Sequence, residues 1–188
     1  FYVGYAGVTL PHKFKIAVGG CPNNCMKPDL NDLGIVGQRV PRYNEEKCRA
    51  CPKCAVEASC PMKAVAMEGG KPVIREEMCN NCGRCVGHCP FGAVEKLDTL
   101  YKVYVGGRWG KKTRIGTPLS KLFTREEVLD VVEKAILLFK SKGETGERFG
   151  STVDRLGVQK VEKMLISDNL LKRKEEILEQ VTVGGASC

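Results

Sequence analysis

Hydrophobic residues alternate with other residues in the first part of the chain and again near its middle. Phe14, Ile16 and Val18 alternate with lysine and alanine, which predicts a half-buried strand that ends at two glycines. Alternation recurs over residues 101–105, and this second predicted strand also ends at two glycines. Between the two, residues 67–74 have apolar positions on both sides of a Gly-Gly pair, which predicts a short hairpin.

Beyond residue 120 the spacing of the hydrophobic residues becomes helical. Thr124 and Glu127 have the spacing of a capping box, and the helix that they begin is predicted to end at Gly143. Further helices are predicted from Ser151 and from Asp168. The residues that give these helices apolar faces are Val128, Val131, Val132, Ala135, Ile136, Phe139, Leu170, Leu171, Ile177, Leu178 and Val181. The chain therefore combines strands with helices.

Eight of the eleven cysteines lie in two runs that repeat one spacing, CRACPKCAVEASCP and CNNCGRCVGHCP. In each run three cysteines are spaced C-x2-C-x2-C, and a fourth follows with a proline behind it. Such spacing brings three thiolates to three corners of one iron-sulfur cube and leaves the fourth corner for a distant cysteine. Thiolates also bind zinc, but a zinc ribbon uses two cysteine pairs separated by a longer loop.

Residues 44–96 resemble the bacterial-type ferredoxin domain with two 4Fe-4S clusters. In that arrangement the fourth cysteine of each run binds the cluster of the other run. The resemblance implies one cluster on Cys48, Cys51, Cys54 and Cys89. It implies a second cluster on Cys79, Cys82, Cys85 and Cys60. The gap between Cys54 and Cys60 is longer than in the shortest ferredoxins, so we expect a bulged loop there.

A third cysteine motif follows the first predicted strand. Gly19 and Gly20 lead directly into Cys21 and Cys25, in the stretch GGCPNNC. A glycine pair lets the backbone approach a bulky ligand closely, and a C-x3-C turn with proline and asparagine inside it directs both sulfurs one way. The spacing alone does not distinguish two metal ligands from two ordinary buried thiols.

The strand PHKFKIAV followed by GGCPNNC resembles the siroheme-binding stretch of the sulfite and nitrite reductases. The resemblance implies a third 4Fe-4S cluster at Cys21 and Cys25, with Cys25 bridging that cluster to the siroheme iron. The order of strand, cysteines, inserted ferredoxin and strand is similar to that of the dissimilatory and anaerobic sulfite reductases. The stretch GERFGSTVDRLG resembles the closing signature of the same family. The further C-x5-C pair that this family has upstream of this stretch has no counterpart here, since no cysteine precedes Cys21.

This resemblance implies an α+β siroheme and 4Fe-4S reductase domain in two halves, 1–43 and 97–188, interrupted by the ferredoxin domain at 44–96. It implies the C-terminal portion of an oxidoreductase that passes electrons to siroheme and reduces sulfite to sulfide with six electrons. The family's anion-binding catalytic residues lie upstream, so none is assigned here. Because the chain begins with Phe1 rather than methionine, we expect a truncated N-terminus.

A basic cluster follows the second glycine pair. Arg108, Lys111, Lys112 and Arg114 lie within seven residues. Such a run suits siroheme carboxylates, for which Arg108 is our candidate, and it equally suits a solvated loop. The implied partners are sulfite or nitrite, an electron-donor protein or subunit, and further subunits of an oligomer.

Composition and charge restrict the remaining function classes. The 188 residues are 43% hydrophobic, without a stretch that suits a membrane span or a signal peptide, so we expect a cytoplasmic protein. Ten cysteines have metal-type spacings, which favours metal over disulfides, and Cys188 is left over. The formal charge is +8, but residues 44–96 carry eight basic and seven acidic residues, and no nucleic-acid motif is present.

Two other functions stay open at this level. One is a non-catalytic ferredoxin-type electron-transfer subunit in which the flanking domain binds no tetrapyrrole. The other keeps the cofactors but reduces nitrite in place of sulfite. The role of Cys25 distinguishes the first alternative, while nothing in the sequence separates nitrite from sulfite.

Overall fold

The computed structural model describes residue 5 and residues 7–180, with the backbone alone for residues 96–98. Phe1, Val181 and Cys188 lie outside the described residues. The chain divides into two compact units, and the first comprises residues 1–19, 24–36 and 101–188. The second comprises residues 20–23 and 37–100. The chain passes from one unit to the other between residues 36 and 37 and again between residues 100 and 101. The domain boundaries predicted from sequence are 43/44 and 96/97. Each passage between the units lies within a long strand, over residues 33–43 and 94–105.

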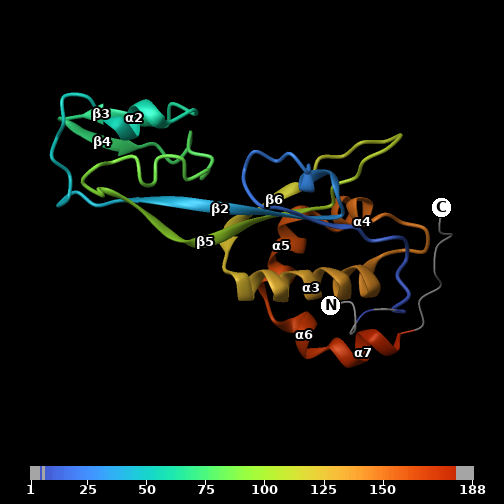
Figure 1. The fold of residues 1–188 in the computed structure, drawn as a ribbon. Helices are drawn as coiled ribbons and strands as arrows, with labels where there is room; N and C mark the ends of the chain where they lie inside the picture. Colours follow the sequence, from blue (N-terminus) through green and yellow to red (C-terminus); the bar gives the residue numbers. More distant parts are fainter. Residues whose placement is uncertain (1–4, 6, 181–188) are drawn as a thin grey trace. The chain divides into compact units, whose positions relative to one another are not determined.

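The first unit is built on a four-stranded sheet (Figure 1). Its strands, in spatial order, are β1 (Ile16–Gly19), β2 (Leu33–Tyr43), β5 (Val94–Val105) and β6 (Thr117–Phe123). β1 is parallel to β2, with Ile16 opposite Leu33, and the 3-10 helix η1 (Pro28–Leu30) connects them. β5 and β6 are antiparallel, with Tyr101 opposite Phe123. The predicted strand over 101–105 is thus the end of β5.

Five helices complete the described part of this unit. They are α3 (Arg125–Lys142), α4 (Phe149–Leu156), α5 (Val158–Ile166), α6 (Asn169–Lys172) and α7 (Lys174–Glu179). The Thr124 hydroxyl accepts the Glu127 N–H, and the Glu127 carboxylate accepts the Thr124 N–H, so the predicted capping box is confirmed. Gly143 ends α3, as predicted. α3 contacts α5, α6 and α7 and lies between the sheet and α6 (Figure 1).

Three phenylalanine rings form the centre of the first unit's core. Phe139 and Phe149 are fully buried, with ring centroids 5.4 Å apart. Phe14 packs against both at 5.8 and 5.1 Å, and its ring lies at 75° to that of Phe149. Val103 and Val105 present the sheet's inner face to this core. The apolar face predicted for α3 is therefore buried against the sheet and the aromatic rings.

The first predicted strand differs from its pattern. Ile16 and Val18, expected on a buried face, are 41% and 61% exposed. β1 is the edge strand of the sheet, and these two side chains line an open groove of 270 Å³ together with Leu129 of α3. Alternation indicates which residues share a face, but the tertiary structure decides whether that face is covered.

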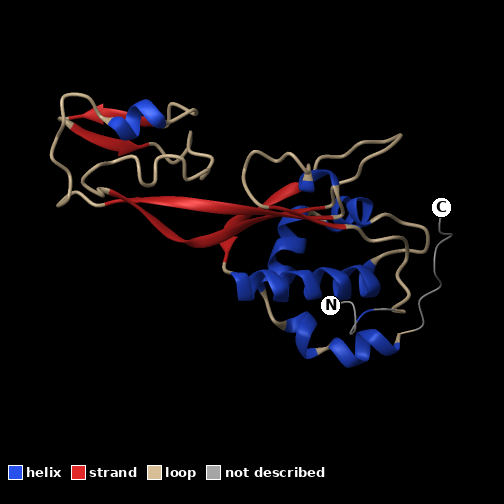
Figure 2. Cartoon of the chain, in the orientation of Figure 1, coloured by secondary structure: helices blue, strands red, loops and turns tan. Residues whose placement is uncertain are grey.

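The second unit is mostly loop, with one hairpin and one short helix (Figure 2). β3 (Val65–Glu68) and β4 (Lys71–Ile74) pair antiparallel, and α2 (Ala55–Ser59) precedes them. Gly69 and Gly70 form the turn with φ angles of 57° and 80°, which suit glycine, so the predicted hairpin is confirmed. A small apolar core holds this unit together and consists of Val56, Val65, Cys85 and Val94.

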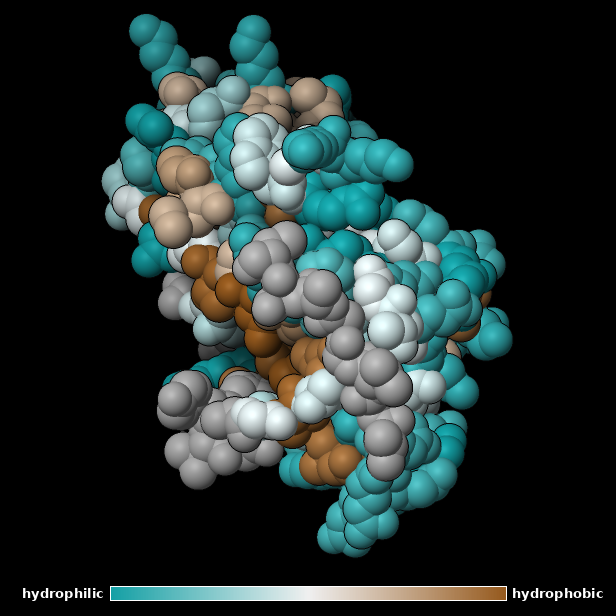
Figure 3. Space-filling model, turned by 90° about the vertical axis from the view of Figure 1, so that its right-hand side faces the viewer, coloured by the Kyte–Doolittle hydropathy of each residue, from teal (hydrophilic) through white to brown (hydrophobic). Residues whose placement is uncertain are grey.

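Polar residues cover much of the visible surface. Figure 3 shows one face on which hydrophilic residues surround a narrow strip of hydrophobic ones. Among the described residues, none of the helices has the length and apolar character needed to cross a membrane.

Candidate functional site

The two cysteine runs fold into the same local turns. In the first C-x2-C loop of each run the residue before the second cysteine is left-handed, with φ of 49° at Ala50 and 56° at Asn81. Three residues after the fourth cysteine of each run, Lys63 and Gly92 also have positive φ, at 52° and 67°. Their N–H groups donate to the carbonyls of those fourth cysteines, at 3.2 and 3.0 Å. The repeated sequence therefore gives a repeated backbone.

The repeat extends into the short strand segments beyond each run. Ala64 and Ala93 are both 1% exposed and begin equivalent segments. The Ala64 carbonyl accepts the Arg75 N–H at 2.8 Å, and the Ala93 carbonyl accepts the Asn44 N–H at 2.8 Å. Asn44 and Arg75 are thus equivalent positions, each four residues before the first cysteine of its run.

Four cysteines line the first cavity of the second unit. Cys48, Cys51 and Cys54 come from the first run, and Cys89 comes from the second. Arg49, Lys53, Phe91 and several smaller apolar residues complete the lining. This is the set of four that the ferredoxin pattern implies for one cluster; that it binds a cluster stays a prediction.

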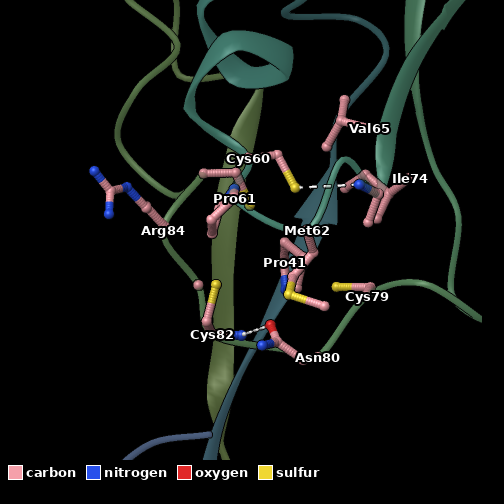
Figure 4. A pocket seen from close by; sticks show the side chains of 13 residues that line it. Pro41, Cys60, Pro61, Met62, Val65, Ile74, Cys79, Asn80, Cys82 and Arg84 are labelled. Carbon is pink, nitrogen blue, oxygen red and sulfur yellow. Dashed lines mark hydrogen bonds between the residues drawn. The ribbon is translucent and has the colours of Figure 1, made fainter. Parts of the chain in front are cut away.

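The other four cysteines line a second cavity (Figure 4). Cys60 of the first run lies there with Cys79, Cys82 and Cys85 of the second. The Cys60 sulfur accepts the Ala64 N–H at 3.3 Å, which fixes its direction. Cysteines that are close in sequence are thus shared between two cavities, in the manner that the two-cluster pattern implies.

Burial affects the acidity of these thiols differently in the two cavities. Desolvation by burial is the largest effect on Cys79 and Cys85, and it raises the pKa of both thiols. The pKa of Cys48 is instead lowered, because the Tyr43 hydroxyl and then the Ala50 amide interact with its sulfur. None of these eight cysteines of the described chain forms a disulfide. Soft sulfur donors in apolar cavities fit iron-sulfur clusters, which bind deprotonated cysteine.

Cys21 and Cys25 lie in the turn between β1 and η1, and both are exposed. A Cβ at Gly19 would come within 2.9 Å of the Pro28 ring, so this glycine is needed for packing against η1. A Cβ at Gly20 would meet no atom within 4 Å, so open space lies beside this backbone. The room at Gly20 fits the approach of a bulky ligand, and the ligand roles of the two cysteines stay predictions.

The basic cluster occupies a loop between β5 and β6. Arg108 and Arg114 pair through their backbones, with N···O distances of 2.8 and 2.9 Å. The Arg108 Nε donates to the Lys112 carbonyl at 2.8 Å, which orients the guanidinium within the loop. Arg114 binds Asp154 through two nitrogens, at 3.0 and 2.6 Å, and the Gly106 carbonyl at 2.9 Å. Arg114 therefore holds the loop to α4.

A buried ion pair, which the sequence pattern did not indicate, supports the ends of two strands. Asp32 is fully buried and accepts two hydrogen bonds from Arg148 Nη2, at 3.0 and 2.8 Å, and one from the Lys15 N–H at 3.0 Å. Its backbone carbonyl accepts the Gly106 N–H at 2.8 Å. Burial raises the pKa of Asp32, and the Lys15 amide and Arg148 oppose that rise. The pair fixes the start of β1 and the end of β5, which lead to both glycine pairs.

Comparison with family models identifies the family. Residues 2–174 match the family described as nitrite and sulphite reductase 4Fe-4S domain. The chain belongs to the nitrite and sulphite reductase family.

Relatives of this nitrite and sulphite reductase chain include named sulfite reductases. It is 36% identical over 152 residues to a coenzyme F420-dependent sulfite reductase of Methanocaldococcus jannaschii, a match that covers 80% of this chain and 24% of the relative. It is 39% identical over 132 residues to one subunit of the anaerobic sulfite reductase of Salmonella typhimurium, a match that covers 68% of this chain and 37% of the relative. The chain thus spans less than half the length of these relatives.

A solved structure has the same fold. The crystal structure of dissimilatory sulfite reductase I superposes with a TM-score of 0.58 at 23% sequence identity, over 83% of this chain and 43% of that one. The predicted fold class, α+β with a 4Fe-4S reductase domain, is confirmed by this likeness together with the family match.

The described residues of this family member contain no group of three or more His, Cys, Asp or Glu side chains arranged to hold a single metal ion. A 4Fe-4S cube is larger than one ion and takes its cysteines around a wider volume. Each cysteine set of the second unit surrounds a cavity and not a point, which is the arrangement that a cluster needs.

Proposed function

We propose that this chain forms part of a sulfite reductase of the anaerobic or dissimilatory type, which reduces sulfite to sulfide with six electrons. The observation that carries the proposal is the sharing of eight cysteines between two cavities, four in each, in a chain of the nitrite and sulphite reductase family. Two relatives whose printed names are sulfite reductases support the choice of sulfite.

Two sets of residues would hold the electron-carrying groups of the second unit. One 4Fe-4S cluster would be bound by Cys48, Cys51, Cys54 and Cys89. The other would be bound by Cys60, Cys79, Cys82 and Cys85. A third cluster and a siroheme would lie at Cys21 and Cys25, where Gly20 leaves open space. When bound, the clusters carry single electrons and the siroheme supplies the iron at which the anion is reduced.

The chain's own residues position these groups. The Asp32–Arg148 pair fixes the strand ends before both glycine pairs, and the Arg114–Asp154 pair holds the basic loop. Arg108 is the candidate for a siroheme carboxylate, because its Nε bond to the loop backbone leaves the two terminal nitrogens of the guanidinium for a bidentate contact. An electron-donor protein or subunit and an oligomeric enzyme belong to the same proposal.

The decisive experiment is acid-acetone extraction of the anaerobically purified native protein, followed by an optical spectrum of the extracted pigment. A siroheme spectrum supports the reductase, and sulfite and nitrite assays then identify the anion. Absence of tetrapyrrole, with iron enough for two clusters alone, would instead indicate a ferredoxin-type electron-transfer subunit.

Two substitutions sharpen this test. Cys25→Ser is expected to abolish siroheme retention, because Cys25 is the proposed bridge to its iron. Cys60→Ser is the matched control, since it removes a ligand of the second unit and is expected to leave siroheme in place. Equal siroheme content in wild type and Cys25→Ser would refute the role of Cys25.

A further inference from the structure

The side chain of Tyr43 has a buried hydroxyl group that the fold leaves without a hydrogen-bond partner among the described residues. Tyr43 is the last residue of β2, and its half-buried ring packs against the apolar core of the second unit. Its hydroxyl oxygen is buried without a nitrogen or oxygen partner among the described residues. A buried hydroxyl that lacks a partner is costly, so the position calls for an acceptor.

Cys48 is the group that the hydroxyl is placed to meet. The Tyr43 hydroxyl and the Cys48 sulfur interact. A phenol loses its proton only at about pH 10, so the hydroxyl remains a donor. A thiol is a weak acceptor, whereas a thiolate bound to iron is a strong one. The Ala50 amide also interacts with the same sulfur, so Cys48 has two potential donors.

The second repeat lacks this donor. Asn44 and Arg75 are equivalent positions, so the residue equivalent to Tyr43 is Ile74. Ile74 lines the other cysteine cavity with an apolar side chain. The position of Tyr43 thus carries a hydrogen-bond donor in the first repeat and none in the second, although the local backbones repeat.

We propose that the Tyr43 hydroxyl donates a hydrogen bond to the Cys48 thiolate when that sulfur binds iron, and that this bond makes the Cys48 cluster easier to reduce. This inference rests on the proposed function, because it requires clusters in the second unit. One electron enters the cluster from the donor protein, and the proton stays on the tyrosine oxygen. A hydrogen bond to a ligand sulfur stabilises the added negative charge, which raises the reduction potential.

The consequence is an unequal pair of clusters. An electron that reaches the second unit would rest preferentially on the cluster held by Cys48, Cys51, Cys54 and Cys89. The bond is expected to change the equilibrium constant for reduction by about threefold to tenfold, and a tenfold change is about 59 mV for one electron. Tyr43 is a positioning residue in this role, since it acts through Cys48.

The test is a redox titration of the native full-length protein, followed by electron paramagnetic resonance of the reduced clusters. Tyr43→Phe removes only the hydroxyl, and Tyr104→Phe in the first unit is the matched control. We expect Tyr43→Phe to lower the potential of one ferredoxin-type cluster, leave the other unchanged, and reduce the difference between them. Unchanged potentials with full iron content would overturn the inference.

A second variant covers the case in which Tyr43→Phe fails to retain its clusters. Site-specific 3-fluorotyrosine at position 43 keeps the ring and makes the hydroxyl a stronger donor, so the potential of the same cluster should rise. No change would again overturn the inference. Wild-type protein without any ferredoxin-type cluster signal would refute the proposed function itself, a result distinct from clusters whose potentials do not move.

Discussion

Replacing Asp32 by asparagine tests the buried ion pair that supports the strand ends. The carboxylate accepts three hydrogen bonds, two from Arg148 and one from the Lys15 N–H. An amide of the same shape has one carbonyl oxygen and one NH2 group. Because Arg148 Nη2 contacts both carboxylate oxygens, the NH2 group of Asp32→Asn faces the guanidinium in either orientation, so donor meets donor.

The expected loss follows from the burial of both partners. The Asp32 side chain is 0% exposed and that of Arg148 is 15% exposed, so the guanidinium loses its counter-ion where little water can replace it. Breaking a buried pair costs about 3–5 kcal/mol, and the partial exposure of Arg148 places this case near 3 kcal/mol. For a chain of this size, that corresponds to a fall in Tm of about 6–12 °C.

Thermal unfolding followed by circular dichroism measures this fall. The matched control is Glu176→Gln, which breaks the exposed Arg173–Glu176 pair on α7, where both side chains are more than half exposed. We expect little change for the control, because exposed ion pairs contribute little to stability. A Tm for Asp32→Asn that falls no further than that of Glu176→Gln would refute the role assigned to the buried pair.

The companion variant Arg148→Met is expected to lose stability in a pH-dependent way, and the direction of that dependence follows from the pKa of Asp32. Burial already raises the pKa of Asp32, and removal of Arg148 takes away one of the groups that oppose this rise. A carboxyl whose folded-state pKa exceeds its unfolded value favours folding most at low pH, and stability falls as pH rises through the folded pKa. The stability deficit of Arg148→Met should therefore be larger at pH 7 than at pH 5. An equal deficit at both pH values would contradict this assignment.

Two further predictions concern the cysteine cavities and the aromatic core. Cys60→Ser should remove about half of the ferredoxin-type iron. In the Cys60→Ser background, Cys79→Ser should remove no further iron, whereas Cys48→Ser should remove the remaining half, as measured by iron analysis. The reverse outcome would contradict the assignment of Cys60 and Cys79 to one cluster. Phe149→Ala removes a fully buried ring that packs against Phe14, and it should destabilise the chain by about 3–5 kcal/mol in denaturant unfolding. A loss below about 1 kcal/mol would show that the aromatic cluster repacks around the gap.

Local features were predictable because neighbouring residues determine them. Thr124 and Glu127 satisfy one another's backbone N–H groups, so the start of α3 is readable from two positions. The Gly69–Gly70 turn requires positive φ at both residues, which only glycine adopts readily. The resemblance to a two-cluster ferredoxin domain likewise implied two sets of four cysteines, and two cavities are lined by those same sets.

Other features could not be read from the pattern. Ile16 and Val18 alternate like buried residues, but β1 is an edge strand and its face is open. Arg114 looked equivalent to Arg108 in the basic run, yet it binds Asp154 and the backbone. Both outcomes depend on residues distant in sequence, which only the assembled fold brings together.

The sequence by itself determined the family-level fold, the two cysteine repeats and the local turns, because spacing and backbone preference act within a few residues. Only the tertiary structure decided the pairing of Asp32 with Arg148, 116 residues apart, and the burial of the Tyr43 hydroxyl at a position whose equivalent in the second repeat is Ile74. Buried polar groups need specific partners, and a folded chain provides those partners from wherever its packing brings them.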